Sequence, residues 1–334
     1  MRLHLNENTA GCSPAVLAAL RELNREAAGF YPDYGAARAS AARHFAVPED
    51  HLLLTNGLDE GILAAVGAAF RDRSGGTPEA IGVAPAFDMY EVCTAALGGR
   101  MVIVRLGGSF ELDPGAIAAA LSPSTRIVFL TNPHNPSGRG YAIDTFTALA
   151  ERIRPVTLFV DEAYADFSGE SLIARGTFAS HPNLIVGRTF SKSYGMAGLR
   201  VGAVLAAPRT LEPLRQVVPP YSLNAWAAAA LPIAIHDHAY REWYCAQAAE
   251  SRALLSEACA RLALPTWPSA ANFVLVRIGA RARDVVRSLA LRGVLVRDRS
   301  SETGCEGCIR ITAGVVDDTR RVIAALEEVL CGAQ

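Results

Sequence analysis

Residues 188–202 read Arg-Thr-Phe-Ser-Lys-Ser-Tyr-Gly-Met-Ala-Gly-Leu-Arg-Val-Gly and follow a short apolar run. That run, Leu184-Ile185-Val186, is typical of a buried parallel strand. Lys192 lies just beyond it. Burial lowers the pKa of a lysine, and an amine at a strand end can then form an imine with a carbonyl. Considered alone, Lys192 fits a surface turn better, because most lysines are exposed.

Three neighbours of Lys192 suggest a chemical role, although only the rest of the chain puts that role ahead of a surface turn. Thr189, Ser191 and Arg200 would place two hydroxyls and a fixed positive charge close to the amine. Such a set suits a phosphate group. A lysine imine beside a phosphate site is the requirement of pyridoxal phosphate. The stretch therefore suggests a site for this cofactor at the end of a strand.

Length and composition fit a soluble enzyme. A chain of 334 residues is long for one core, so we expect a large domain and a smaller one. Half of the residues are apolar and 19% are charged, as in ordinary globular enzymes. A net charge of −1 gives no electrostatic footprint for nucleic acid or an anionic membrane. No apolar run approaches the length of a membrane span.

The seven cysteines predict reduced thiols. Their number is odd, and the chain opens without a secretory leader, so we expect a cytoplasmic protein. Cys305 and Cys308 form a CxxC pair. Because no second pair of cysteines or histidines follows at metal-ligand spacing, we expect no metal site.

The order of elements predicts the fold. Short apolar runs alternate with helical segments up to about residue 205, which is typical of an α/β domain with a mostly parallel sheet between helices. The expected strands cover residues 52–55, 81–84, 101–104, 126–130, 156–160, 184–186 and 201–205. The expected helices cover residues 13–23, 36–45, 57–70, 88–97, 113–121 and 143–153. Functional side chains in such a sheet lie at the carboxyl ends of the strands.

The tail predicts a small α+β domain. It combines helices at 239–262, 282–291 and 317–330 with strands at 273–276, 294–296 and 308–312. We therefore divide the chain into an N-terminal segment (1–30) that packs with the small domain, a large domain (31–235) and a small domain (236–334).

Two further strand ends carry polar residues with a chemical use. Asp161 and Tyr164 follow the strand at 156–160, and Asn135 follows the strand at 126–130. A buried aspartate is costly unless it is paired, and a protonated pyridine nitrogen would be a fitting partner. Considered singly, Asp161 is equally well explained as a helix cap, and Asn135 is equally well explained as a turn residue. Leu58 and Asp59 open a helix after a strand and a glycine, so backbone N–H groups there form a second possible phosphate cradle.

Taken together, these motifs resemble a known family. The matching segments are Asn6-Glu7-Asn8, Tyr31-Pro32, Asp59-Glu60-Gly61, residues 132–136, 160–164, 188–192, 197–200, Pro220-Tyr221, residues 296–298 and residues 309–312. Over nearly its full length the chain resembles the fold-type-I pyridoxal-phosphate enzymes of the class I and II aminotransferases. Within that group it is most similar to the histidinol-phosphate aminotransferases. The resemblance implies a seven-stranded-type sheet sandwiched by helices, with a smaller C-terminal domain.

The resemblance also implies roles for individual residues at the cofactor. Lys192 would hold the cofactor as an internal aldimine and later move a proton between the substrate Cα and the cofactor C4′. Asp161 would pair with the pyridinium nitrogen. The ring oxygen would be bonded by Asn135 and Tyr164, and the ring would stack on Phe87. The phosphate would be held by Leu58, Asp59, Thr189, Ser191, Arg200 and, from the other subunit, Tyr31.

On the substrate side, the resemblance implies that Arg310 receives the acidic group, helped by Arg297, Tyr221 and Asn135. A tyrosine shared across subunits implies a homodimer with shared active sites. The expected reaction is ping-pong transamination of histidinol phosphate, or of an aromatic amino acid, with 2-oxoglutarate and glutamate. Such a reaction belongs to histidine biosynthesis. The small-molecule amino donor and keto acid are the only partners expected besides the second subunit.

Two alternatives remain open. A decarboxylase of a phosphorylated amino acid, similar to threonine-phosphate decarboxylase, would use the same cofactor machinery. A binding protein that keeps the fold without catalysis is the other, and the intact Lys192, Asp161, Asn135 and Arg310 argue against it. Thr9 stands where the family usually has proline. The sequence begins almost at Asn6-Glu7-Asn8, so we expect no counterpart of the N-terminal arm that members of this branch usually carry. Because a few pocket residues set specificity, the fold does not decide the substrate.

Overall fold

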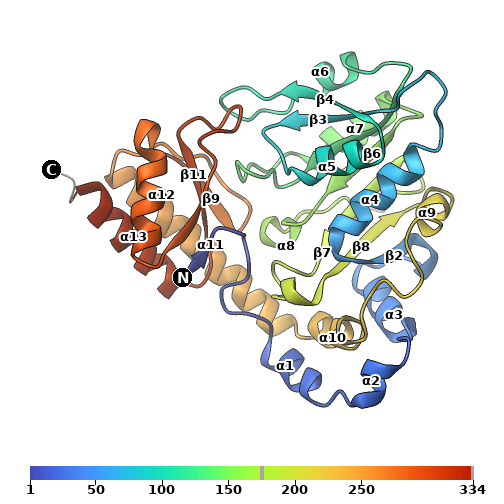
Figure 1. The fold of residues 1–334 in the computed structure, drawn as a ribbon, viewed down its shortest axis with the longest axis horizontal. Helices are drawn as coiled ribbons and strands as arrows, with labels where there is room; N and C mark the ends of the chain where they lie inside the picture. The colour runs from blue at the N-terminus through green and yellow to red at the C-terminus, as the bar shows by residue number, and fades with distance from the viewer. Residues whose placement is uncertain (174–176, 332–334) are drawn as a thin grey trace.

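The larger of two sheets organises the chain (Figure 1). The computed structural model describes residues 1–173 and 177–331. Within them, seven strands pair in the order β2-β8-β7-β6-β5-β3-β4. Their bounds are β2 (Leu52–Asn56), β3 (Glu79–Ala84), β4 (Arg100–Arg105), β5 (Thr125–Thr131), β6 (Thr157–Asp161), β7 (Leu184–Thr189) and β8 (Val201–Ala206). β8 is antiparallel to both β7 and β2, and the other pairings are parallel. The predicted mostly parallel α/β sheet is therefore confirmed.

Helices cover both faces of this sheet, because its central strands are apolar on both sides. Along β5, Ile127 and Phe129 belong to one apolar cluster and Val128 and Leu130 to the other, as the two-residue period of a strand requires. One cluster packs under α4 (Gly57–Ala69), α5 (Met89–Ala96) and α9 (Pro208–Arg215). The other packs under α3 (Gly35–His44), α6 (Pro114–Ala119), α7 (Ile143–Arg152) and α10 (Ala225–His236).

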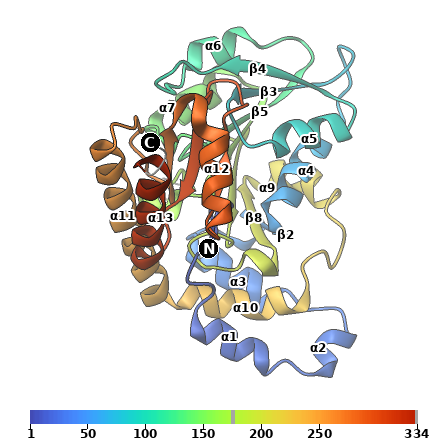
Figure 2. The ribbon, with the colours of Figure 1, turned by 60° about the vertical axis from the view of Figure 1, so that its left-hand side comes forward.

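The smaller sheet pairs in the order β1-β10-β11-β9. Its strands are β1 (Arg2–Leu3), β9 (Phe273–Arg277), β10 (Leu295–Asp298) and β11 (Cys308–Thr312). Three helices pack with it, α11 (His238–Arg261), α12 (Ala282–Leu291) and α13 (Val316–Cys331). They lie together on one side of the sheet in Figure 2. The first residues of the chain thus complete a sheet otherwise built by its last hundred or so.

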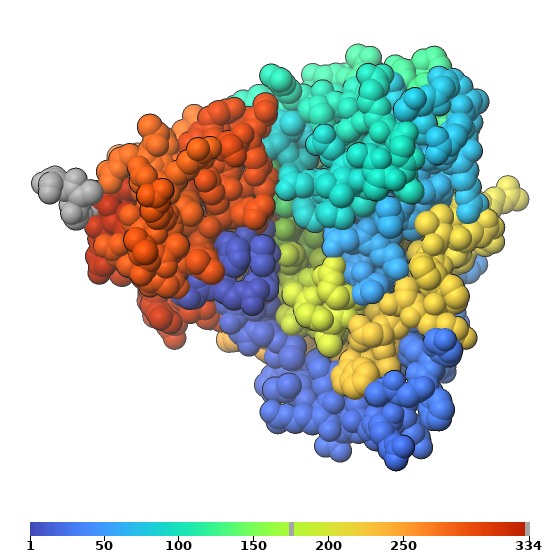
Figure 3. All heavy atoms as spheres, in the orientation of Figure 1, coloured from blue at the N-terminus to red at the C-terminus, as the bar shows by residue number. Residues whose placement is uncertain are grey.

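The N-terminal segment connects the two sheets. After β1 it runs to α1 (Pro14–Arg21) and α2 (Arg25–Gly29), which lie beside α10 in both ribbon views. Ser13 caps α1 as predicted, because its Oγ accepts from the Val16 N–H at 3.2 Å. In Figure 3 the first residues, in dark blue, lie between the small-sheet unit and the yellow-green turn that follows β7. The boundaries at residues 30 and 235 remain our proposal for the division into domains.

The structure adds elements that the sequence pattern does not predict: β1, α2, α8 (Ala165–Ser168), α9 and α10. α10 is buried along most of its length, so it carries no amphipathic period. Pro232 also lies inside it. Among residues 1–173 and 177–331, no helix is long and apolar enough to cross a membrane. In that same part of the chain, Cys305 and Cys308 are unpaired, fully buried thiols, and burial raises the pKa of Cys305 to about 12.

Candidate active site

A cavity of about 570 Å³ opens where β5, β6 and β7 end. Most of the residues predicted for the cofactor line it: Leu58, Asp59, Phe87, Asn135, Asp161, Tyr164, Thr189, Ser191, Lys192 and Arg200. The remaining lining residues are Arg2, Leu5, Glu7, Thr131, Ala163, Ala197 and Gly198. The strand ends thus bring the sequence motifs together around one space.

Lys192 is held on the cavity wall by the N-terminal segment. Its Nζ donates to the Leu5 carbonyl at 3.0 Å and lies 5.9 Å from the centre of the Tyr164 ring. The Asn8 side-chain amide donates to the carbonyl of Ser193, the next residue, at 3.1 Å. Gly195 closes the turn with φ +68°, and a Cβ there would lie 1.9 Å from the Gly11 carbonyl oxygen. Only glycine permits this close approach.

Asp161 is a buried acid among neutral donors. Its side chain accepts from the Tyr90 hydroxyl at 2.8 Å and from the Ala163 N–H at 2.9 Å, and the residue is 4% exposed. Tyr90 also bonds Thr131 at 2.8 Å. Burial raises the pKa of Asp161 to about 6, although the Tyr90 hydrogen bond opposes the shift. A cation bound in the cavity would stabilise the ionised form, so the site fits a protonated pyridine nitrogen.

The first turn of α4 forms an anion cradle. Gly57 has φ +73°, and a Cβ there would lie 2.5 Å from the Arg200 guanidinium, so the missing side chain makes room for Arg200 across the helix start. Arg200 donates to Asp59 at 2.7 Å. The Thr189 hydroxyl donates to the Ser191 hydroxyl at 3.0 Å, and both residues line the same cavity. Free backbone N–H groups at a helix start, two hydroxyls and an arginine fit a phosphate.

Arg310 lies behind this cavity, on β11, and does not line it. It is 6% exposed and donates to the Asn135 side chain at 2.5 Å and to the His4 carbonyl at 3.1 Å. Its buried Nε has no hydrogen-bond partner. Burial lowers the pKa of Arg310 to about 10. Arg297 pairs with it directly across β10 and β11. A buried guanidinium with unused donors fits an acidic group.

Tyr31 and Tyr221 lie elsewhere. Their rings stack on each other with centroids 4.4 Å apart, and they are 80% and 52% exposed. Neither lines the cavity of its own chain that contains Lys192. The structure of one chain therefore does not bring these two predicted residues to the site.

Sequence reasoning also missed residues that shape the site. Tyr90 is fully buried against Asp161, and no motif singles it out. Asn6 donates from its side-chain amide to the Tyr164 hydroxyl at 3.0 Å. Asn6 and Asn8 belong to a motif that the resemblance quotes without a role, so that motif could have pointed to them.

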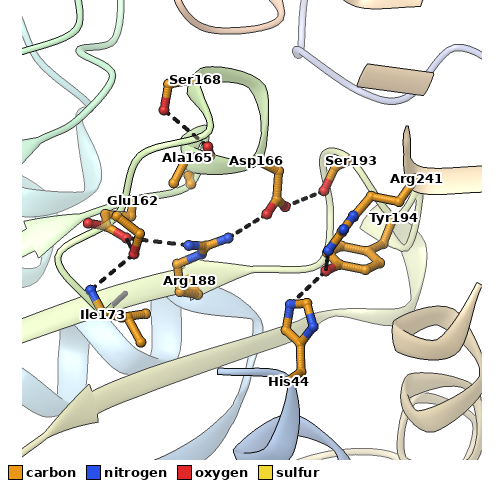
Figure 4. Close-up of polar contacts among 12 residues, drawn as sticks. His44, Glu162, Ala165, Asp166, Ser168, Ile173, Arg188, Ser193, Tyr194 and Arg241 are labelled. Carbon is orange, nitrogen blue, oxygen red and sulfur yellow. Dashed lines mark hydrogen bonds and ion pairs between the residues drawn. The ribbon is translucent and has the colours of Figure 1, made fainter. Parts of the chain in front are cut away.

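A buried charge network supports the two turns that carry Asp161 and Lys192 (Figure 4). Arg188, on β7, lies 3.4 Å from Glu162 and 2.6 Å from Asp166. Asp166 in turn accepts from the hydroxyl of Ser193. Glu162 follows Asp161, and Ser193 follows Lys192. Arg188 therefore links the ends of β6 and β7 below the cavity.

A second branch of this network ends at His44. The Arg241 guanidinium donates to the Tyr194 hydroxyl at 3.3 Å, and that hydroxyl lies 2.9 Å from His44 Nε2. Burial lowers the pKa of His44 to about 4, so its ring is neutral, and Nε2 shares a hydrogen bond with the Tyr194 hydroxyl. Tyr194 is thereby fixed two residues after Lys192.

Comparison with known proteins places this geometry in a family. The family model "Aminotransferase class I and II" matches residues 1–326. The histidinol-phosphate aminotransferase of Symbiobacterium thermophilum is 37% identical over 335 residues, covering 99% of this chain and 90% of that protein. Histidinol-phosphate aminotransferase 2 of Ralstonia nicotianae is 35% identical over 346 residues, covering 100% of this chain and 90% of that protein.

Solved structures agree. The histidinol-phosphate aminotransferase of Sinorhizobium meliloti, in complex with pyridoxal-5′-phosphate, superposes with a TM-score of 0.89 at 27% identity, covering 100% of this chain and 91% of that one. The L-threonine-O-3-phosphate decarboxylase of Porphyromonas gingivalis superposes with a TM-score of 0.82 at 23% identity, covering 99% of both chains. The second likeness shows the fold alone.

Proposed function

Because this chain belongs to the class I and II aminotransferases, we propose that it transaminates histidinol phosphate with 2-oxoglutarate as the amino acceptor. The observation that carries the proposal is the single cavity in which Lys192, Asp161 and the start of α4 converge, with Arg310 behind it. The reaction belongs to histidine biosynthesis, as the names of the relatives suggest.

The residues fit pyridoxal phosphate. Asp161 holds the pyridinium nitrogen, since it is the buried acid of the cavity with neutral donors on both oxygens. The α4 start, Thr189, Ser191 and Arg200 hold the phosphate. Phe87 stacks on the ring, and Asn135 and Tyr164 bond its oxygen. When bound, this cofactor supplies an electron-withdrawing ring that takes up the electron pair released at the substrate α-carbon.

Lys192 does the proton work. With the cofactor bound, Lys192 Nζ would hold it between catalytic cycles. As a free amine, Nζ would take the proton from the substrate α-carbon and give it to C4′ of the cofactor, so that it moves one proton between two carbons. Tyr164 lies close enough to orient Nζ, with 5.9 Å between Nζ and the ring centre.

Arg310 sets the direction in which the substrate binds. Its buried guanidinium receives the acidic group next to the α-carbon, either the phosphate of histidinol phosphate or the carboxylate of glutamate. Asn135, which already bonds Arg310, connects this group to the cofactor ring. Arg297 adds positive charge from the next strand. Both half-reactions of a ping-pong cycle use this one site.

We assign Tyr31 to the site of a second subunit. Its exposed ring and its distance from the cavity of its own chain support a contact across a homodimer interface. Each active site would then contain residues of both chains. Tyr221, which stacks on Tyr31, would lie at the same interface.

A product assay tests this proposal. The purified protein, loaded with cofactor, is incubated with histidinol phosphate and 2-oxoglutarate. We expect stoichiometric glutamate and imidazole-acetol phosphate, identified by mass spectrometry, and no CO2. A phosphorylated amino acid such as O-phosphothreonine, tested in parallel, distinguishes the decarboxylase alternative. Release of CO2 from that compound, without glutamate formation from histidinol phosphate, would replace the transaminase by the decarboxylase.

A further inference from the structure

Two charged residues line the cavity without any part in the chemistry above. Arg2 and Glu7 belong to its wall and also to a neighbouring outer groove of about 660 Å³. Their side chains form an ion pair, with Arg2 Nη2 and Glu7 Oε1 2.7 Å apart. The Arg2 side chain is 63% exposed and that of Glu7 26%. The pair therefore lies where the cavity opens to solvent.

The arginines of the small sheet range from a buried one in the interior to an exposed one at the mouth of the cavity. Leu3, Val296 and Ile309 point into its apolar core, so the alternation of the strands turns Arg2, Arg297 and Arg310 to the opposite face. Arg310 is 6% exposed, whereas the Arg2 side chain is mostly exposed. His4 lies among them: its pKa is lowered by burial and, against the opposing charge of Glu7, by these three arginines. Arg2, Arg297 and Arg310 therefore share one face of the small sheet, with Arg310 buried and Arg2 at the mouth of the cavity.

The position of Glu7 relative to Lys192 is fixed by its neighbours. Asn6 bonds the Tyr164 hydroxyl at 3.0 Å, and Asn8 bonds the Ser193 carbonyl at 3.1 Å. The Glu7 carbonyl itself accepts from the Tyr244 hydroxyl at 3.2 Å. Because residues on both sides are tied down, the carboxylate is presented at a defined place on the wall.

We propose that the Arg2–Glu7 pair lets one cavity accept two chemically different side chains. Arg2 binds the distal carboxylate of glutamate and 2-oxoglutarate. Glu7 accepts a hydrogen bond from the imidazole N–H of histidinol phosphate. This inference rests on the proposed function, which requires both substrates to occupy the same site in turn.

The energetics of the pair suit this role. An exposed ion pair contributes little to stability, so either partner can leave the other at small cost. A charge-assisted hydrogen bond to the substrate replaces the one that is lost. When Arg2 turns to a substrate carboxylate, its ion pair with Glu7 opens and Glu7 keeps its place. When Glu7 bonds an imidazole, Arg2 remains beside the Glu7 carboxylate and away from the ring.

Two variants and a matched control test the proposal in cofactor-loaded protein. The variants are Arg2→Met and Glu7→Gln. The control is Arg321→Met, because Arg321 lines the outer groove and not the cavity. The half-saturating concentrations of glutamate and of histidinol phosphate are measured in separate half-reactions. Calorimetry then measures the binding of two unreactive compounds, glutarate and 3-(imidazol-4-yl)propyl phosphate.

We expect the two variants to have opposite preferences. Arg2→Met weakens the binding of glutamate and glutarate about tenfold, which is the order expected for one charge-assisted hydrogen bond. The binding of both imidazole compounds stays within about threefold of the wild-type value. Glu7→Gln weakens the binding of the imidazole compounds by a similar factor. The binding of glutamate is unchanged or tighter, because Arg2 no longer pairs with a carboxylate at position 7. Arg321→Met changes neither.

The proposal is overturned if each variant changes both substrates by the same factor, or if neither variant changes either. An equal effect of Arg321→Met on glutamate would overturn it as well, since a general charge effect at the mouth would then explain the data. Wild-type protein that converts neither donor would refute the proposed function. The calorimetry with glutarate and the imidazolyl phosphate would then decide this inference by itself.

Discussion

Asp161 shows how the chemistry of one side chain follows from its burial. It is removed from water at the end of β6, and Tyr90 and Ala163 offer it only neutral hydrogen bonds. These bonds do not fully replace hydration, so the pKa of Asp161 is raised to about 6. The protein thus stores an unfavourable charge that a bound cation relieves.

The first prediction concerns how the ionised Asp161 lowers the free energy of unfolding of the cofactor-free protein. The pKa of Asp161 is raised from its ordinary 3.8, so wild-type stability falls as pH rises from about 4 to about 6. Asp161→Asn removes the titration. Above pH 7 the variant should be more stable relative to wild type than at pH 4, by up to roughly 3 kcal/mol from the two-unit shift. Urea unfolding across this pH range measures the difference.

Asp317→Asn is the matched control, because that carboxylate is 90% exposed. Its stability relative to wild type should vary by less than about 0.5 kcal/mol over the same range. A pH-independent difference for Asp161→Asn would show that the buried carboxyl does not titrate as described.

The second prediction concerns Lys192. Lys192→Ala should bind pyridoxal phosphate without the yellow absorption of the lysine-bound cofactor, and borohydride should fix no cofactor to the chain. Mass spectrometry of peptides from reduced wild-type protein should find the label on Lys192. If the variant keeps the yellow band and the reducible bond, the cofactor is attached to an amine other than Lys192.

At the scale of elements, the strand ends could be predicted from the sequence, whereas the residues that pack around them to complete the site could not. The alternation of apolar runs located every strand of the large sheet, and the polar residues after β5, β6 and β7 converge on the cavity as the parallel arrangement requires. Two-residue β1 carries no period, and its pairing with β10 depends on contacts across almost the whole chain. Tyr90 and Arg2 reach the site only through tertiary packing, so no local pattern shows them.

The third prediction concerns Arg188, which connects the ends of β6 and β7. Arg188→Met leaves the buried Glu162 and part-buried Asp166 without their cation. Breaking such a pair by removing one partner should cost about 3–5 kcal/mol of unfolding free energy. Chemical denaturation measures it. The exposed pair of Arg38 and Glu49 offers the control, since Arg38→Met should cost less than about 1 kcal/mol. Equal losses of unfolding free energy in the two variants would show that Arg188 does not have this structural role.

At the scale of the whole molecule, the site depends on how the two sheets meet. The large sheet carries Lys192 and Asp161, the small sheet carries Arg310, and residues 4–8 lie between them with bonds to both. The motif resemblance predicted the two halves of the site. It left the connecting segment without a role, because the bonds of Asn6 and Asn8 join residues far apart in the sequence.

The fourth prediction concerns the proposed homodimer. If Tyr31 serves the partner's site, a Lys192→Ala chain and a Tyr31→Ala chain should complement each other. Each mixed dimer would contain one complete site, formed by Lys192 of one chain and Tyr31 of the other. Co-expressed, separately tagged chains purified as mixed dimers should recover about half of the wild-type activity, one site of two. Mixed dimers no more active than the Tyr31→Ala protein alone would place Tyr31 outside the partner's site.

A half-reaction without any keto acid tests whether the protein is a transaminase. Cofactor-loaded protein receives one amino donor at a time, and the absorption of the aldehyde form of the cofactor is followed. We predict that histidinol phosphate and glutamate each abolish the yellow band, and that 2-oxoglutarate restores it. Conversion by phenylalanine and tyrosine but not by histidinol phosphate would make the enzyme an aromatic aminotransferase. A yellow band that no amino donor converts would show that the protein does not transaminate these donors.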